Sequence, residues 1–200
     1  MNCEVITLQL IFHVECSPEE YHKAGREFTF PKPEQCLHPD CLMPVPPKSH
    51  GFYSRNAITI RFAGRILICR FYCEYCGHTM SYLPSFCLPH YQYTLEMIFL
   101  GLLCHFFKLL PFLLALMQRL YWQRQHLQFY RRRFKANLNR IQMVLRCLIP
   151  GIVLPDENDI TKGAQEVLSI ITTGFNTIQA FSTRFFAQCN YSFMAPCKLV

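Results

Sequence analysis

The pattern of apolar and polar residues divides the chain into a first part with strand-like alternation and a second part with helical periodicity. Alternation is clearest from Ile58 to Phe62, and it resumes through Ile66 and Ile68 on the way to Cys73. We therefore predict a β-hairpin that turns at Ala63-Gly64 and whose second strand ends at this cysteine.

The residues before this hairpin carry signals for a strand, a short helix and an extended run. The β-branched stretch from Val5 to Val14 predicts a strand, while Pro18 and Gly25 are placed to begin and end a helix. Pro31 and Pro33 disfavour helix in the residues that precede them. An extended segment is therefore expected there.

Downstream, the spacing of apolar residues becomes that of helices. Thr94 is the predicted N-cap of a first helix, and Pro111 suits the first turn of a second. A third helix has the clearest periodicity and is stopped by Pro150-Gly151. Its apolar seam comprises Leu127, Tyr130, Phe134, Leu138, Ile141, Leu145 and Leu148. Two further amphipathic helices are predicted over residues 164–172 and 177–190.

Two close cysteine pairs flank the predicted hairpin and form the strongest chemical signal. Cys36 and Cys41 precede it, and Cys73 and Cys76 follow its second strand. Structural Zn²⁺ takes four ligands in a tetrahedron, and a close cysteine pair lets one turn of backbone present two thiolates. We predict one structural zinc ion per chain, held by these four cysteines. Alternative ligands near the pairs are His38, Cys69 and His78.

The N-terminus bears on the state of the thiols. Met1-Asn2-Cys3-Glu4 has no basic region, and polar residues interrupt the apolar stretch that follows, so we expect no signal peptide and a cytoplasmic location. Thiols in that compartment stay reduced, which favours metal binding over disulfides. The chain has 12 cysteines, and those outside the two pairs are expected to be small buried side chains.

Positive charge is concentrated in one part of the chain. The formal net charge is +7, and no acidic residue occurs between Glu96 and Asp156. Such a segment is typical of a polyanion partner, either nucleic acid or an anionic membrane surface; a merely solvated helix face is the alternative. The predicted DNA contacts are Arg55, Arg61, Arg119, Arg124, His126, Arg131, Arg132, Arg133, Lys135 and Arg140.

Some of the arginines have two possible roles. Four thiolates around Zn²⁺ carry a net negative charge that amides or cations must offset. Arginines near the second cysteine pair could offset this charge or contact phosphate, and the sequence leaves both open. They are Arg55, Arg61, Arg65 and Arg70.

Two alternatives concern the helical part. The Leu127–Leu148 seam suits a protein-interaction or dimerisation helix that binds a second copy or a transposase partner. The stretch Phe99–Met117 is long enough for a single membrane span, but Lys108 and Pro111 interrupt it.

Catalysis is not expected. The acidic residues after Glu96 crowd between Asp156 and Glu166, which fits a solvated hinge better than a two-metal site. No phosphate-binding glycine loop or nucleophile elbow occurs. We predict a non-enzymatic protein.

These signals predict an α+β fold in which a zinc ribbon, a β-hairpin with two cysteine turns, precedes an all-helical bundle that is helix-turn-helix-like. The predicted boundaries are a ribbon domain over 1–90 with an N-terminal strand, a basic helical segment over 91–150, a C-terminal helical segment over 151–195 and a frayed tail over 196–200.

Three segments carry a resemblance to known proteins. They are Cys36-Leu37-His38-Pro39-Asp40-Cys41, His50-Gly51-Phe52-Tyr53-Ser54-Arg55, and the run from Cys73 through Leu83-Pro84-Ser85-Phe86. They resemble the N-terminal zinc ribbon of bacterial insertion-sequence transposases, and more closely an uncharacterised bacterial family of short transposon-linked zinc-ribbon proteins, a domain of unknown function. The resemblance covers residues 28–150.

It implies a DNA-binding role in mobile-element biology, with zinc on the four cysteines and the basic helices against the phosphate backbone. No catalytic domain of a full transposase is present, so the role implied is accessory or regulatory, or that of a decayed transposase. A protein of this kind bound to DNA would be associated with the nucleoid.

Overall fold

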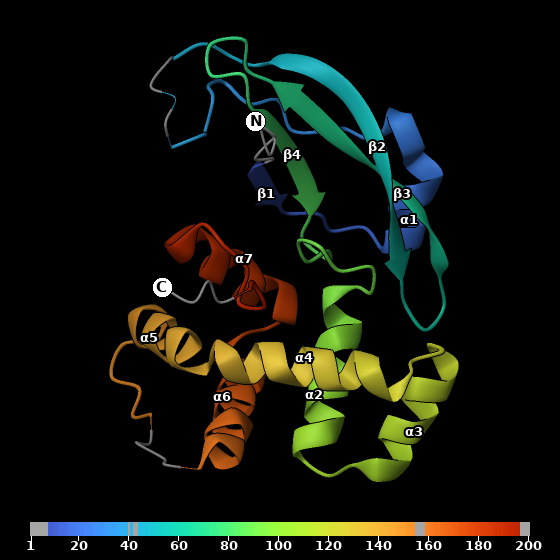
Figure 1. Cartoon of the computed structure of the whole chain (residues 1–200), viewed down its shortest axis with the longest axis vertical. Helices are drawn as coiled ribbons and strands as arrows, with labels where there is room; N and C mark the ends of the chain where they lie inside the picture. The colour runs from blue at the N-terminus through green and yellow to red at the C-terminus, as the bar shows by residue number, and fades with distance from the viewer. Residues whose placement is uncertain (1–7, 40, 42–43, 155–158, 197–200) are drawn as a thin grey trace, which may run out of the picture. The chain divides into compact units, whose positions relative to one another are not determined.

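The computed structural model describes residues 8–39, 41, 44–154 and 159–196 (Figure 1). Over these residues it contains a mixed four-stranded sheet and seven α-helices, which confirms the predicted α+β class. The chain forms two compact units, Met1–Ala57 with Phe62–Gln92 and Ile58–Arg61 with Tyr93–Val200. The predicted segment 151–195 and all but the first two residues of the predicted segment 91–150 fall in the second unit.

The described part of the first unit holds the sheet and one α-helix. Its elements are β1 (Leu8–Phe12), α1 (Pro18–Ala24), a 3₁₀ turn (Gly25–Glu27), β2 (Lys48–Ile58), β3 (Ala63–Tyr72) and β4 (Thr79–Pro84). Helix α1 begins as predicted, because the Ser17 hydroxyl accepts from the Glu20 amide while the Glu20 carboxylate accepts from the Ser17 amide. It ends at Gly25, whose φ is 52°.

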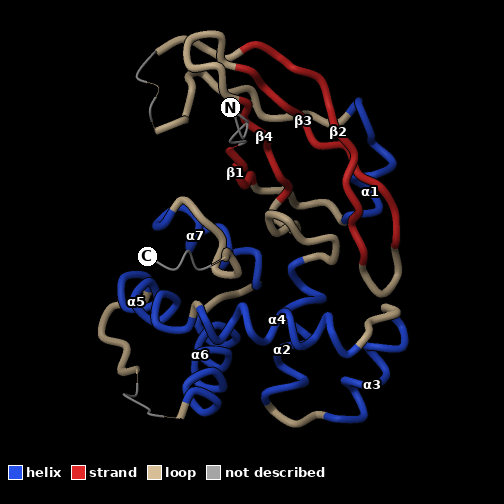
Figure 2. The backbone as a smooth tube through the Cα atoms, viewed as in Figure 1, coloured by secondary structure: helices blue, strands red, loops and turns tan. Residues whose placement is uncertain are grey.

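The sequence did not predict strand β4 or its pairing with β1. The strand order of the sheet is β1-β4-β3-β2, so the N-terminal strand lies beside β4 (Figure 2). Strand β1 runs parallel to β4, and β4 runs antiparallel to β3. Strand β1 occupies Leu8–Phe12, within the stretch predicted as a strand, and residues 1–7 lie outside the described chain. A hairpin of β2 and β3 is present.

The predicted turn at Ala63-Gly64 is wrong. Strand β2 ends at Ile58 and β3 already begins at Ala63, so residues 59–62 make the turn. The Phe62 ring lies over Gly64, where an added Cβ would come within 2.5 Å of it. Gly64 therefore serves close packing inside the strand.

Two apolar clusters stabilise the first unit. One surrounds Tyr21, which is 1% exposed and whose hydroxyl donates to the Leu67 carbonyl at 3.0 Å. The other joins the cysteines of both pairs to Phe71 and Met80. The sheet thus supports the cysteine region directly.

The described residues of the second unit form six helices. They are α2 (Leu95–Phe106), α3 (Leu110–Arg119), α4 (Arg124–Ala136), α5 (Leu138–Leu148), α6 (Ile160–Gly174) and α7 (Ile178–Cys189). The predicted starts at Thr94 and Pro111 are confirmed. The helix predicted over 177–190 is present as α7, whose N-terminus is capped by the Thr177 hydroxyl and which is followed by Asn190 in the left-handed region.

The single helix predicted through the Leu127–Leu148 seam is wrong. The helix is interrupted at Asn137, between α4 and α5. This residue is fully buried, and its side-chain amide donates to the carbonyls of Arg133 at 2.8 Å and Ala195 at 2.9 Å. Polar residues that bond the backbone compete with helix in this way. The central seam residues are buried inside the unit, so this seam is part of its own core and not a free docking face. The buried seam residues are Tyr130, Phe134, Leu138, Ile141 and Leu145.

The stretch Phe99–Met117 is likewise not one helix. It is divided between α2 and α3 at a turn where Lys108 has a φ of 57°. Across the described parts of the chain, no helix combines the length and the apolar character needed to cross a bilayer.

Candidate metal centre and basic surface

The four predicted cysteine ligands converge from two turns. Cys36 and Cys41 lie in the loop before β2, where the Cys41 amide donates to the His38 carbonyl at 2.9 Å. Cys73 and Cys76 lie between β3 and β4. That turn closes through a 2.9 Å bond from the Gly77 amide to the Cys73 carbonyl, and Gly77 has a positive φ of 71°.

The sulfur atoms form a compact group. All four Sγ atoms lie within 4.8 Å of one another. The Cys36–Cys76 distance is 3.8 Å and the Cys41–Cys73 distance is 3.7 Å, so each close contact joins one turn to the other. A tetrahedron of sulfurs about 2.3 Å from a central zinc has edges of about 3.8 Å. The group could therefore hold a metal ion.

Burial and backbone amides act differently on these thiols. Burial raises the pKa of Cys36 to about 12, and it also raises the pKa of Cys76. Burial acts on Cys73 in the same direction, but hydrogen bonds from the backbone amides of Cys76 and Tyr75 outweigh it and lower the pKa to about 7. Cys73 is thus the thiol that the turn best prepares to be a thiolate.

The two histidine alternatives lie beside the cysteine group. Among the described side chains, the cluster of metal-binding atoms consists of the four cysteines. The rings of His38 and His78 stack on each other, with centroids 3.8 Å apart and planes inclined by 11°. This stacked pair was not predicted, although each histidine stands two residues after a cysteine of the cluster, which was a usable signal.

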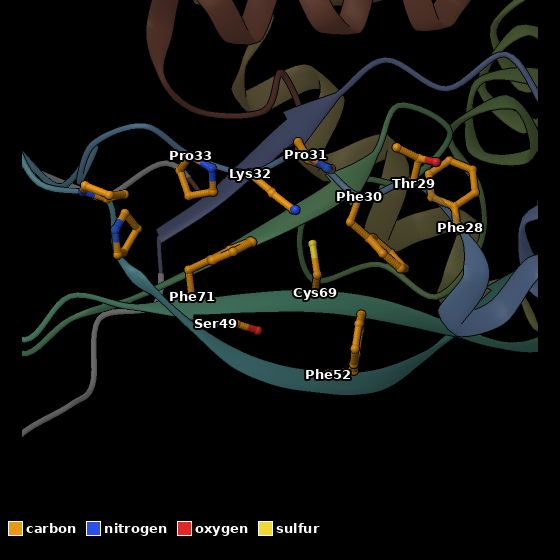
Figure 3. A pocket seen from close by; sticks show the side chains of 12 residues that line it. Phe28, Thr29, Phe30, Pro31, Lys32, Pro33, Ser49, Phe52, Cys69 and Phe71 are labelled. Atoms are coloured by element: carbon orange, nitrogen blue, oxygen red, sulfur yellow. The ribbon is translucent and has the colours of Figure 1, made fainter.

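Cys69 points elsewhere. Its side chain extends into a cavity of about 580 Å³ bounded by Phe30, Phe52 and Phe71 (Figure 3). Burial raises its pKa to about 11, as expected for a thiol among aromatic rings. It lies outside the sulfur group.

Several of the predicted DNA-contacting residues have partners within their own unit. Arg55 donates to the carbonyls of Leu88 and Tyr91. His126 accepts from the Gln123 amide at 3.0 Å and so caps α4. Arg55 thus stabilises the loop after β4, and His126 stabilises the N-terminus of α4.

The basic residues of α4 and α5 make similar internal contacts. Arg131 lies 3.3 Å from His105, and burial together with that positive charge lowers the histidine pKa. Arg133 lies over the Phe129 ring at 5.3 Å. Two others also stack on rings, Lys135 on Phe106 and Arg140 on Tyr191. The cation–π contacts of Lys135 and Arg140 therefore help to stabilise the helical unit.

A smaller set of predicted contacts is exposed. Arg119, Arg124 and Arg132 lie on the surface of the helical unit, and Arg61 is exposed at the hairpin turn. Arg132 and Arg133 border a surface hollow of about 380 Å³ with Phe129. Fewer basic side chains are thus exposed than the sequence predicted as DNA contacts.

No protein-family model matches this chain, and the comparisons with curated proteins and with solved structures also gave no match.

Proposed function

We propose that the four cysteines bind one structural zinc ion and that the protein is a non-catalytic, cytoplasmic DNA-binding protein associated with transposable elements. The observation that carries the zinc proposal is the pair of sulfur distances, 3.7 and 3.8 Å, across the two turns. Four thiolates suit zinc and leave no open coordination position, so the ion would hold the fold. The sheet and its cysteine turns would then form a zinc ribbon.

The DNA proposal is supported by charge. The segment between Glu96 and Asp156 has no acid to oppose its bases, and Arg119, Arg124 and Arg132 are exposed on it. Arginines of this kind contact phosphates and supply affinity without choosing a sequence. If the helical unit is helix-turn-helix-like, α4 is the element expected to face the duplex. The resemblance to transposon-linked proteins points the same way.

Metal analysis tests the zinc proposal. Protein purified without added chelator should contain about one zinc per chain, and Cys73→Ser should abolish binding. Cys69→Ser is the matched control. Cys69, on β3, is buried as Cys73 is, but it lies outside the sulfur group. Equal zinc content in both variants would refute the ligand set.

A salt titration on nonspecific duplex DNA tests the second part. Removing Arg124 and Arg132 together should weaken binding and reduce the slope of log K against log salt by up to about two. The control removes Arg26 and Lys32, two exposed basic residues of the first unit, and so carries the same change in net charge. Affinity that does not depend on salt would contradict DNA binding through phosphates.

A further inference from the structure

Polar side chains from all four strands meet on one face of the sheet, in a row that the zinc proposal does not use. Gln9 of β1 is the register partner of Ser81 of β4, and Ser81 is the partner of Arg70 of β3. Residues directly opposite each other point to the same face. The Arg70 guanidinium in turn lies 5.7 Å from the ring centre of Tyr53 on β2.

Each of these four side chains has a buried polar atom without a hydrogen-bond partner among the described residues. The atoms are Gln9 Oε1, Ser81 Oγ, Arg70 Nε and the Tyr53 hydroxyl. Ser81 is wholly buried, with an exposed fraction of 0%. Buried polar groups are almost always bonded, so these neighbouring atoms call for a further group besides the interaction between the Tyr53 and Ser81 hydroxyls.

The surroundings of this row are positive. Burial raises the pKa of the Tyr53 phenol, and the charges of Arg55 and Arg70 and the nearby Ser81 hydroxyl oppose that rise. Gln9 and Tyr53 also border a surface cavity of about 250 Å³. Its other lining residues are Arg55, Asn56, His90, Tyr91 and Gln92, and none of them is acidic.

We propose that this row and its cavity bind a phosphate group. Two arginines supply positive charge, and the Tyr53 hydroxyl, which borders the cavity, can donate to a phosphate oxygen. The wholly buried Ser81 hydroxyl acts on the Tyr53 hydroxyl instead. The Gln9 amide can turn to donate as well, since its oxygen and nitrogen are interchangeable by a flip. A phosphate has the charge and the number of acceptor oxygens to satisfy these groups together. The site lies in the first unit and does not depend on DNA binding by the second.

Binding is tested by titrating the full-length, metal-loaded protein with inorganic phosphate, observed by calorimetry, with chloride at matched ionic strength as the reference. Saturable binding is expected with phosphate and none with chloride. Tyr53→Phe, which removes only the hydroxyl, should weaken binding about tenfold. Tyr82→Phe is the control, because Tyr82 is paired with Cys69 and so lies on the opposite face of β4 from Ser81.

Ser81→Ala provides a second, smaller change and should also weaken phosphate binding. Equal affinity of the wild type, Tyr53→Phe and Ser81→Ala for phosphate, or no binding above the chloride reference, would overturn the site and leave water as its occupant. Each variant is checked for wild-type metal content, which separates loss of the site from loss of the fold.

The source of the phosphate is distinguished by a further pair of probes. A short oligonucleotide with a 5′-phosphate is compared with the same strand ending in a 5′-hydroxyl. If the phosphorylated strand binds more tightly and the difference disappears in Tyr53→Phe, the site takes the end of a nucleic acid. If inorganic phosphate binds and the two strands do not differ, the site takes a free phosphate; both results support the proposed chemistry.

Discussion

The two units differ in what holds them together. In the first, four cysteine sulfurs come within 4.8 Å of one another in turns that are neither helix nor strand. In the second, buried aromatic rings pack against one another, and Phe181, Phe185 and Phe193 are each fully buried. The helices are stabilised by their own packing, and the first unit has an apolar cluster around Tyr21 as well as the cysteine group. If the cysteines bind a metal as proposed, the stability of the first unit would depend on that ion in addition to its packing, and that of the second on packing alone.

Metal removal should give the largest effect and separate the units most clearly. Structural zinc sites contribute apparent binding free energies of about 10–16 kcal/mol, so a chelator should abolish cooperative unfolding of the first unit. Hydrogen exchange should accelerate in β3 and β4 and stay slow in α5 and α6. Unchanged protection of β3 and β4 in metal-free protein would remove the basis of the comparison.

Loss of a central aromatic residue should act on the other unit. Phe181 is fully buried, and its ring lies 5.3 Å from those of Phe175 and Phe193. Phe181→Ala should lower the free energy of unfolding of the helical unit by about 3–5 kcal/mol, measured by denaturant titration. Zinc content should not change.

The matched control is Phe112→Ala, because Phe112 is 70% exposed on α3 and its removal should cost little. Equal destabilisation by the two variants would mean that the helical unit does not rely on this aromatic core.

The features that the sequence predicted are local ones. Close cysteine spacing determines a turn, and Pro18, Thr94 and Pro111 indicate helix starts from the residues next to them. Pairing of β1 with β4 could not be predicted in this way, since it joins residues some seventy positions apart, Leu8 with Met80. The row of orphaned polar atoms depends on that same pairing and was missed with it.

The helix break at Asn137 also depends on a long-range contact, and changing it should have an effect of intermediate size. Local periodicity favours one continuous helix, but the buried amide bonds the Ala195 carbonyl, 58 residues away. Asn137→Leu would extend the apolar seam and leave that carbonyl without its donor. We expect a loss of about 1–3 kcal/mol in the stability of the helical unit. A gain in stability and in helical circular dichroism would show that the break and its bond to the Ala195 carbonyl do not stabilise the helical unit.

The smallest effect concerns the second cysteine turn. Gly77 has a φ of 71° and no atom within 4 Å of an added Cβ, so Gly77→Ala should cost about 1–2 kcal/mol through backbone strain alone. Gly51→Ala is a matched control, because Gly51 has a φ of 77° and equally open surroundings but lies on β2, away from the cysteines. Both variants should lose similar stability with metal bound. Only Gly77→Ala should also weaken zinc affinity in a chelator competition, by about tenfold, because its amide closes the turn on the Cys73 carbonyl. If Gly51→Ala weakened zinc binding equally, the loss of affinity would come from strain in the sheet and not from the turn that Gly77 closes.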